Sequence, residues 1–207
     1  GGTGYLTVPT IAPVHAVDIE RKSRDRIISN SLALGCTYLT SSISDSDTTL
    51  NCKNIYYDTT QRIGFPDEGE VLIPFYDTTV TPNRWNVERI LYGSRNTSAN
   101  TITVATGGRG YRGTTAAAHT VLTGTYSASG TTCTVTVTSA AAHNYVTGMK
   151  VFLDFTSGPT VEPINWGFDG EYAVTVTSGN AFTVEFPFSQ TSSGNVSILP
   201  EVRLRSL

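Results

Sequence analysis

A run in which threonine alternates with apolar side chains is the feature that most constrains how this chain folds. From Thr132 to Thr138 every second residue is a threonine. The positions between them hold Cys133, Val135 and Val137. Successive side chains of a β-strand point to opposite faces, so the apolar residues share one face and the threonines the other. The run predicts a half-buried strand whose apolar face covers a core.

A second strand and a turn follow in the same stretch. Residues 150–155 place Val151, Leu153 and Phe155 on one face of a strand. Gly148 precedes them and can adopt the positive φ that a turn before a strand often needs. The stretch holds no nucleophile, acid pair or ligand set, which indicates a protein that acts by shape and contact.

Composition gives the fold class. Serine and threonine make up about a quarter of the 207 residues, an abundance that suits largely solvated sheet surfaces. Charged residues are 15% and the net charge is −3, which indicates no nucleic-acid partner. The chain is long enough for two small domains. We therefore expect an all-β protein.

The cysteines give no sign of a metal or cofactor site, and the hydropathy pattern gives no sign of a membrane span. Cys36, Cys52 and Cys133 are odd in number and show no CxxC spacing, so they predict buried free thiols. No apolar run is long enough for a membrane span, and no signal-peptide pattern is present. We expect no metal, no cofactor and no membrane insertion. Because the chain begins with Gly1 rather than methionine, either its N-terminus was processed or it is part of a longer chain, and we expect the second.

Four segments follow from the turn and strand signals. Residues 1–35 predict an extended arm and one short helix over Asp18–Arg26. Residues 36–120 and 121–199 predict two small antiparallel β-sandwich or barrel-like modules. Residues 200–207 form a tail that can add an edge strand. The arm is the candidate assembly segment, because its prolines exclude a central paired strand; its key residues are Tyr5, Pro9, Ile11 and Pro13.

Both modules resemble β modules that recur in virion structural proteins of tailed bacteriophages, marine ones especially. The resemblance covers most of the chain beyond Cys36, and it implies a virion location without saying which part of the particle. The residues that carry it in the first module are Gly64-Phe65-Pro66 with Gly69, Glu88–Tyr92 and Arg109–His119. In the second module they are Thr123–Tyr126, Leu153–Gly158, Asp169–Tyr172 and Ala181–Val184.

The chain departs from that pattern in three places, where we expect contacts special to this protein. A longer loop covers Tyr76–Asn86 and carries Trp85. His143-Asn144-Tyr145 stands where the pattern has a histidine followed by glycine. An insertion over Pro159–Gly167 carries Trp166.

The glycine-rich stretch Gly107–Gly113 has two interpretations. Its backbone amides with Arg109 and Arg112 can cradle an anion, although the stretch lacks the lysine-serine ending of a phosphate loop. The favoured interpretation is a tight connection between the modules. In it Tyr111 covers the end of one sheet and stiffens the junction, while backbone carbonyls or nearby acids hold the two arginines.

Other polar residues have ordinary explanations. His119 and His143 each follow three alanines, and we expect both to be hydrogen-bonded loop residues rather than a metal pair. Asp45 and Asp47 indicate a turn rather than a calcium loop. The acids at 67–70 lie on a turn, which gives no reason for a raised pKa in a glycosidase pair.

The low charge, the threonine-rich strands and the resemblance to phage proteins together predict a non-enzymatic virion structural subunit of a tailed phage, in the tail, baseplate, fibre or capsid surface. Its expected partners are other copies of itself and other virion proteins, contacted through β-rich surfaces. The alternative is a host-attachment or carbohydrate-binding module of a tail fibre, in which Trp85 and Trp166 stack on a surface glycan of the host.

Overall fold

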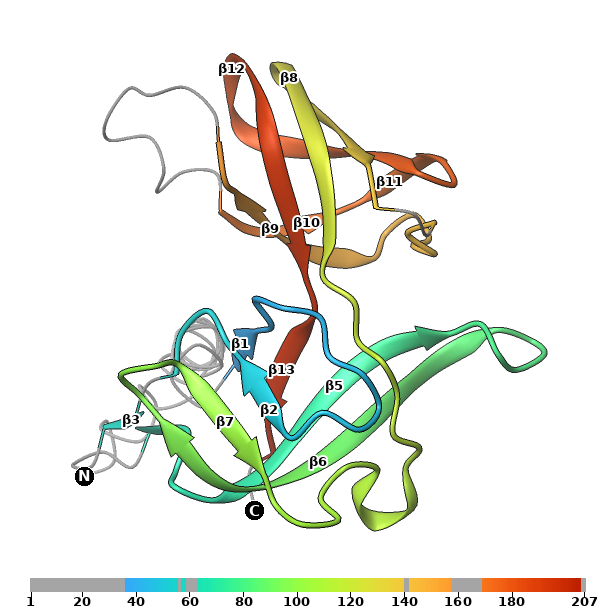
Figure 1. Ribbon diagram of the computed structural model, residues 1–207. Helices are drawn as coiled ribbons and strands as arrows, with labels where there is room; N and C mark the ends of the chain where they lie inside the picture. The colour runs from blue at the N-terminus through green and yellow to red at the C-terminus, as the bar shows by residue number, and fades with distance from the viewer. Residues whose placement is uncertain (1–35, 56, 59–62, 140–141, 158–168, 206–207) are drawn as a thin grey trace, which may run out of the picture.

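The computed structural model describes residues 36–55, 57–58, 63–139, 142–157 and 169–205. The protein is all-β, with two curled antiparallel sheets that form two barrel-like modules (Figure 1). The expected arm and helix of residues 1–35 lie outside the described residues, as does Trp166.

The first module is a six-stranded antiparallel sheet that curls until its ends meet. Its strands lie in the order β1-β13-β5-β6-β7-β2. An antiparallel bridge from Leu39 to Cys52 joins the segment after β1 to the segment after β2, which closes the sheet. The strands are β1 (Cys36–Tyr38), β13 (Glu201–Leu204), β5 (Gly69–Asp77), β6 (Arg84–Asn96), β7 (Thr101–Val104) and β2 (Thr49–Asn51). A separate small ladder pairs β3 (Tyr57–Asp58) with β4 (Ile63–Gly64).

The second module is built around one long antiparallel ribbon, β8 (Leu122–Val137) against β12 (Ala181–Leu199). The free side of β12 pairs with β11 (Thr175–Ser178) at its start and with β9 (Lys150–Phe155) at its end. β10 (Gly170–Ala173) pairs with β9 and continues almost directly into β11. The ribbon therefore connects β11 with β9 within one curled sheet.

The alternation of threonine and apolar residues explains strand β8. Its buried positions include Cys133, Val135 and Val137, and the threonines between them are exposed. The predicted strand is the second half of a longer one, which bends at Gly130 (φ 66°) opposite a bulge in β12. The bend folds β8 back on itself, so that Thr138 N donates to the Thr123 carbonyl at 2.8 Å.

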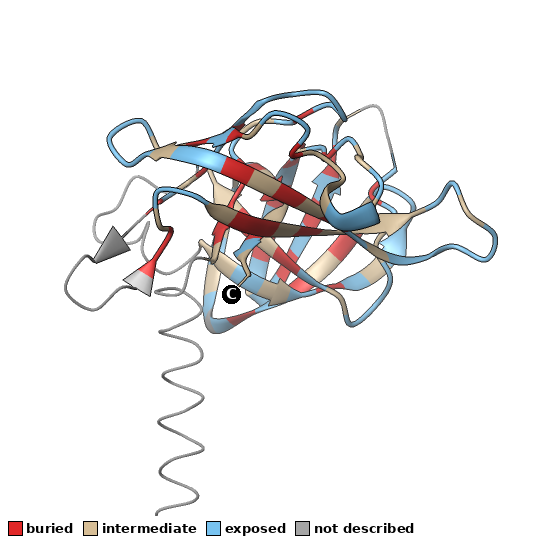
Figure 2. Ribbon diagram, turned by 90° about the horizontal axis from the view of Figure 1, so that it is seen from below, coloured by how far each residue is buried: buried red, intermediate tan, exposed pale blue. Residues whose placement is uncertain are grey.

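Each module has its own core. Among the described residues of the second module, fourteen buried ones form one cluster, which includes Phe182 and Leu153. A second cluster fills the first module and includes Phe65 and Tyr92. Figure 2 shows buried and exposed segments alternating along the strands, as expected when one face of each strand points into a barrel.

The chain crosses between the modules twice. It leaves the first module after His119, builds the second, and returns through Pro200 into β13. The tail at 200–207 was expected to add an edge strand, but β13 lies between β1 and β5. The second module is therefore inserted into the first, and the two crossings lie next to each other (Figure 1).

The β5–β6 hairpin differs from the expected loop. β5 continues through Pro74 to Asp77, and β6 already begins at Arg84, so the connection covers only residues 78–83. Trp85 is therefore a strand residue that pairs with Tyr76. β6 and β7 form a second hairpin, with only residues 97–100 between them.

Candidate functional site

The glycine-rich stretch points Arg109 into the first module. Arg109 Nε and Nη2 donate to the Glu88 carboxylate at 2.7 and 3.0 Å. Nη1 donates to the carbonyls of Ser44 (2.6 Å) and Asp47 (3.0 Å), and Nη2 also donates to that of Ala117 (2.8 Å). These contacts use all five N–H groups of the guanidinium. Arg109 is thus held by an acid and by carbonyls and joins three segments of the chain.

Glu88 is the centre of this arrangement and is fully buried. Its carboxylate also meets His119 Nε2 at 2.8 Å and accepts hydrogen bonds from the amides of Gly110 (3.2 Å) and Ala117 (3.1 Å). Burial alone raises the pKa of Glu88, but the hydrogen bonds from His119 and Arg109 outweigh it and lower the pKa to about 2. The buried Glu88 carboxylate is thus paired with Arg109 and fully hydrogen-bonded, and these contacts fix the turn that contains Arg109 and Gly110.

The role of Glu88 was missed, although the sequence carried a signal for it. Glu88, Ile90 and Tyr92 alternate along β6, and all three are buried. An acid in register with two core residues indicates a buried carboxylate that needs a cation. The sequence does not show which arginine supplies that cation.

Arg112 and Tyr111 lie in a 3-10 turn, η1 (Tyr111–Gly113), on the outside of the first module. The Arg112 guanidinium lies 5.4 Å from the centroid of the Tyr111 ring, and its Nε is 3.6 Å from Glu70 Oε2. Glu70 is also paired with Arg89 and Arg205. One buried carboxylate thus gathers three arginines from separate segments.

Tyr111 was expected to stiffen the junction between the modules, but the junction lies elsewhere. The turn that holds Tyr111 is on the side of the first module away from the second (Figure 1). The crossings run instead through residues 120–121 and Pro200. The glycine-rich stretch is a tight connection inside one module.

The contacts that tie the modules together come from β1, the segment after β2, β9 and β10. Tyr38 stacks on Phe152, and its hydroxyl donates to Glu171 Oε1 at 3.1 Å. Lys53 Nζ pairs with Asp154 at 2.6 Å and Asp169 at 3.0 Å. These contacts join the modules on one side of the crossings.

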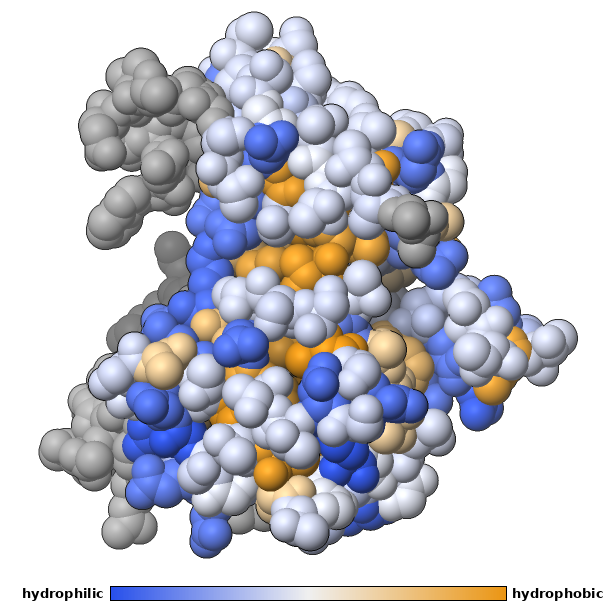
Figure 3. All heavy atoms as spheres, in the orientation of Figure 1, coloured by the Kyte–Doolittle hydropathy of each residue, from blue (hydrophilic) through white to orange (hydrophobic). Residues whose placement is uncertain are grey.

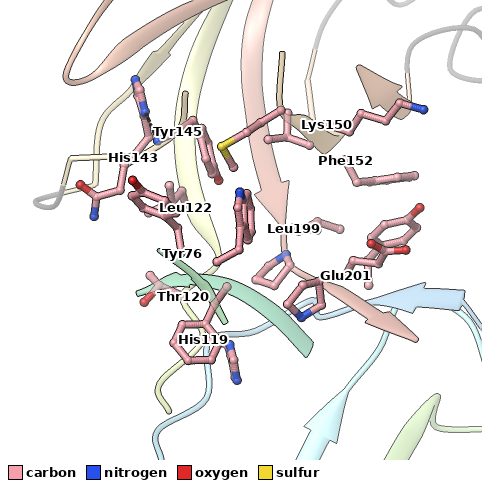
Figure 4. Close-up of a pocket in the computed structure, with 18 of the residues that line it drawn as sticks. Tyr76, His119, Thr120, Leu122, His143, Tyr145, Lys150, Phe152, Leu199 and Glu201 are labelled. Atoms are coloured by element: carbon pink, nitrogen blue, oxygen red, sulfur yellow. Dashed lines mark hydrogen bonds between the residues drawn. The ribbon is translucent and has the colours of Figure 1, made fainter. Parts of the chain in front are cut away.

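A cleft of about 620 Å³ lies between the two modules. Figure 3 shows a band of hydrophobic residues in the recess between them. In the close-up, Tyr145 and Lys150 of the second module lie above, His119 and Thr120 of the first lie below, and Leu199 lies between (Figure 4). The cleft is the candidate functional site, because it gathers aromatic and charged side chains from both modules.

Several aromatic residues meet at this cleft. Trp85 is 52% exposed and contacts Tyr76 edge to face, with ring centroids 5.7 Å apart. Phe75 contacts His119 in the same way at 5.4 Å. Of the two tryptophans proposed from the sequence, Trp85 lines the cleft. Tyr76 and Tyr145, from two of the segments where special contacts were expected, also line it, whereas Tyr38, Phe75 and Phe152 were missed, since only the placement of one module on the other brings them together.

Both histidines at the cleft have structural partners. His119 contacts Glu88 as described above, and His143 Nε2 lies 2.9 Å from the Ser178 carbonyl. The Tyr145 amide donates to His143 Nδ1 at 2.9 Å. Both side chains are buried, as hydrogen-bonded histidines in a folded protein usually are.

The remaining chemistry is limited in the part of the chain that the structure describes. Cys36, Cys52 and Cys133 are free thiols there. Burial raises the pKa of Cys52 and Cys133 to about 12. Within the same residues no group of three or more potential ligands can hold a metal ion, and no helix is long and apolar enough to cross a membrane.

Comparisons with protein-family models, with curated proteins and with solved structures found no match to this chain.

Proposed function

We propose that the chain is a non-enzymatic structural subunit of a tailed-phage particle, which assembles with other copies and other virion proteins through β-rich contacts. The observation that carries the proposal is the β5–β6 hairpin, which reaches beyond the first barrel (Figure 1). Its exposed face is apolar, and its edges are open.

The exposed face holds two apolar cross-strand pairs. Pro74 lies opposite Val87, and Tyr76 lies opposite Trp85. Residues two apart share a face, so these four side chains form one patch. Trp85 and Val87 are two of the three large hydrophobic residues that are exposed in the described part of the chain, the third being Val146. Val87 does not line the cleft between the modules, and an exposed apolar side chain on a projecting hairpin supports a contact with a neighbouring subunit.

The hairpin also offers backbone groups. β13 pairs with β5 only at Val71 and Leu72, and β7 pairs with β6 only from Tyr92 onward. Over Ile73–Asp77 and Arg84–Val87 the two strands pair only with each other among the described residues. Open edges of this kind accept a strand from another chain, which supports assembly through β contacts.

A structural role also agrees with how the buried polar groups are used. Glu88, Glu70 and His119 are engaged in ion pairs and hydrogen bonds that tie loops to the first barrel. The virion location itself rests on the resemblance of the two modules to phage proteins.

The test is the mass of the protein in solution, measured by sedimentation. The wild type is expected to sediment as an oligomer, and Val87→Glu as a 22.2 kDa monomer, because a charge in the patch is not tolerated in an apolar interface. Val146→Glu is the matched control, since it changes an exposed valine outside the hairpin and should leave the oligomer intact. A monomeric wild type, or an unchanged Val87→Glu oligomer, overturns the proposal.

A further inference from the structure

The cleft between the modules has the size and enclosure of a ligand site. Its volume of about 620 Å³ falls within the range of about 300–1,000 Å³ that is usual for such pockets. The two chain crossings form its floor at Leu122 and Leu199, and one module forms each wall (Figure 4). The Tyr38–Phe152 and Lys53 contacts hold the walls together, so the site is preformed.

Aromatic rings at the first-module wall leave surface for a ligand. The edge-to-face contact between Trp85 and Tyr76 covers only part of each ring, and Trp85 remains half exposed. A large aromatic ring at the edge of a cleft offers an apolar platform without losing much conformational freedom when a ligand binds. Such a platform matches the C–H face of a sugar ring.

Polar groups that face the same space lack partners. Among the described residues, the hydroxyls of Tyr76 and Tyr145 form no hydrogen bond, and the Lys150 ammonium forms no ion pair. Opposite charges are close at hand in Glu171 and Glu201, whose carboxylates each retain acceptor capacity beyond their present hydrogen bonds. The cleft thus presents both donors and acceptors.

The charges that line the cleft cancel. Glu171 and Glu201 balance Lys150 and Arg203, and the remaining lining residues carry no formal charge when the histidines are neutral. A site without net charge favours a neutral ligand over a phosphate or an acidic peptide. A ligand that needs apolar stacking together with many donors and acceptors is a polyhydroxylated one.

We propose that the cleft between the two modules binds a neutral oligosaccharide. One sugar ring stacks on Trp85, and the hydroxyls of Tyr76 and Tyr145 with Lys150 and Glu171 hydrogen-bond to sugar hydroxyls.

Binding is tested with Trp85 fluorescence. The chain has two tryptophans, so Trp166→Phe leaves Trp85 as the only reporter. An immobilised panel of neutral glucose, galactose, mannose and N-acetylglucosamine oligosaccharides first selects a ligand, which is then titrated against the Trp166→Phe protein. Saturable quenching of Trp85 by the selected sugar is expected.

Variants then assign the site. Trp85→Ala, followed by calorimetry, should weaken binding about tenfold, as expected for the loss of one stacking contact. Tyr145→Phe removes only a hydroxyl and should weaken binding severalfold. Tyr111→Ala changes a tyrosine on the outer turn and should bind as the parent does. Circular dichroism and thermal unfolding confirm that each variant is folded.

Three results would overturn the proposal. The first is that no neutral sugar of the panel binds. The second is that binding survives both Trp85→Ala and Tyr145→Phe unchanged. The third is a preference for sialylated or sulfated sugars, or for a peptide, over every neutral sugar, because that result contradicts the charge balance of the cleft.

Discussion

The rings of Tyr38 and Phe152 stack across the boundary between the two modules, with centroids 3.9 Å apart and planes 29° apart. Phe152 also lies 5.4 Å from Lys53 Nζ, measured to the ring centroid. Since the chain crosses the boundary twice on the floor of the cleft, this contact adds a third point of attachment. Three points that do not share one axis prevent the modules from rotating about the crossings.

Phe152→Ala should therefore loosen the junction while leaving each barrel folded. The loss of the ring pair and of part of the buried area should lower the free energy of unfolding by about 1–2 kcal/mol. Limited proteolysis should then cut faster near residues 120–121. Tyr38→Phe is the control, because it removes only the hydrogen bond to Glu171. Equal cutting rates in the wild type and Phe152→Ala would show that the crossings alone fix the modules.

The Glu88 cluster predicts a pH dependence. The pKa of Glu88 falls from 4.5 to about 2 on folding, so the stabilisation is complete above about pH 5 and is lost as the pH falls toward 2. A depression of this size corresponds to about 3 kcal/mol. Urea unfolding of the wild type should show this loss between pH 5 and pH 2.

Glu88→Gln isolates that contribution. The variant leaves the Arg109 charge buried without its counter-ion, and it should be about 3–5 kcal/mol less stable than the wild type at pH 7. Its stability should fall less steeply with acid, because the titrating carboxyl is gone. Parallel stability curves for the two proteins between pH 5 and pH 2 would contradict the role assigned to Glu88.

The bend of β8 predicts sensitivity to added volume at Gly124. A Cβ atom at Gly124 would lie 2.4 Å from the Thr136 carbonyl oxygen of the same strand, so Gly124→Ala should cost about 1–3 kcal/mol. Gly179→Ala is the matched control in the same module, since a Cβ there meets nothing within 4 Å. Thermal unfolding compares the two, and an equal effect would mean that the two halves of β8 do not lie in contact.

The cysteines predict slow thiol chemistry in the native protein. Burial raises the pKa of Cys52 and Cys133 to about 12, and it raises that of Cys36 with help from Glu201. Thiolates are the reactive form, so a chromogenic disulfide reagent at pH 8 should react quickly only after denaturant is added. Cys36 is only partly buried, so fast reaction of Cys52 or Cys133 in the folded protein is the result that would contradict this burial.

Much of the fold was readable from local pattern. The alternation in β8 and the apolar residues of β9 identified core strands, because a period of two depends only on neighbouring residues. The limits of β5 and β6 were missed, since the apolar cross-strand pairs Pro74–Val87 and Tyr76–Trp85 extend the hairpin through a segment rich in turn residues. Tertiary pairing overrode local propensity there.

The cleft was beyond sequence reasoning for a different reason. It depends on β13 returning to the first module and on Tyr38 meeting Phe152, and these contacts join segments far apart in the chain. Arg109 stood out in the sequence as a possible anion ligand because of its glycine-rich surroundings, but Glu88 and the Ser44 and Asp47 carbonyls, which hold it, come from distant segments. Neither spacing nor composition determines such long-range contacts.

The central claim, that this chain is a structural subunit of a tailed-phage particle, is tested most directly by an electron cryomicroscopy reconstruction of particles purified from the cells that make it. We expect density for both barrels in the particle, with the β5–β6 hairpin packed against a neighbouring subunit through Val87 and its open strand edges. Particles that lack the chain, or a hairpin whose Val87 side chain and strand edges are open to solvent in the assembled particle, would contradict it.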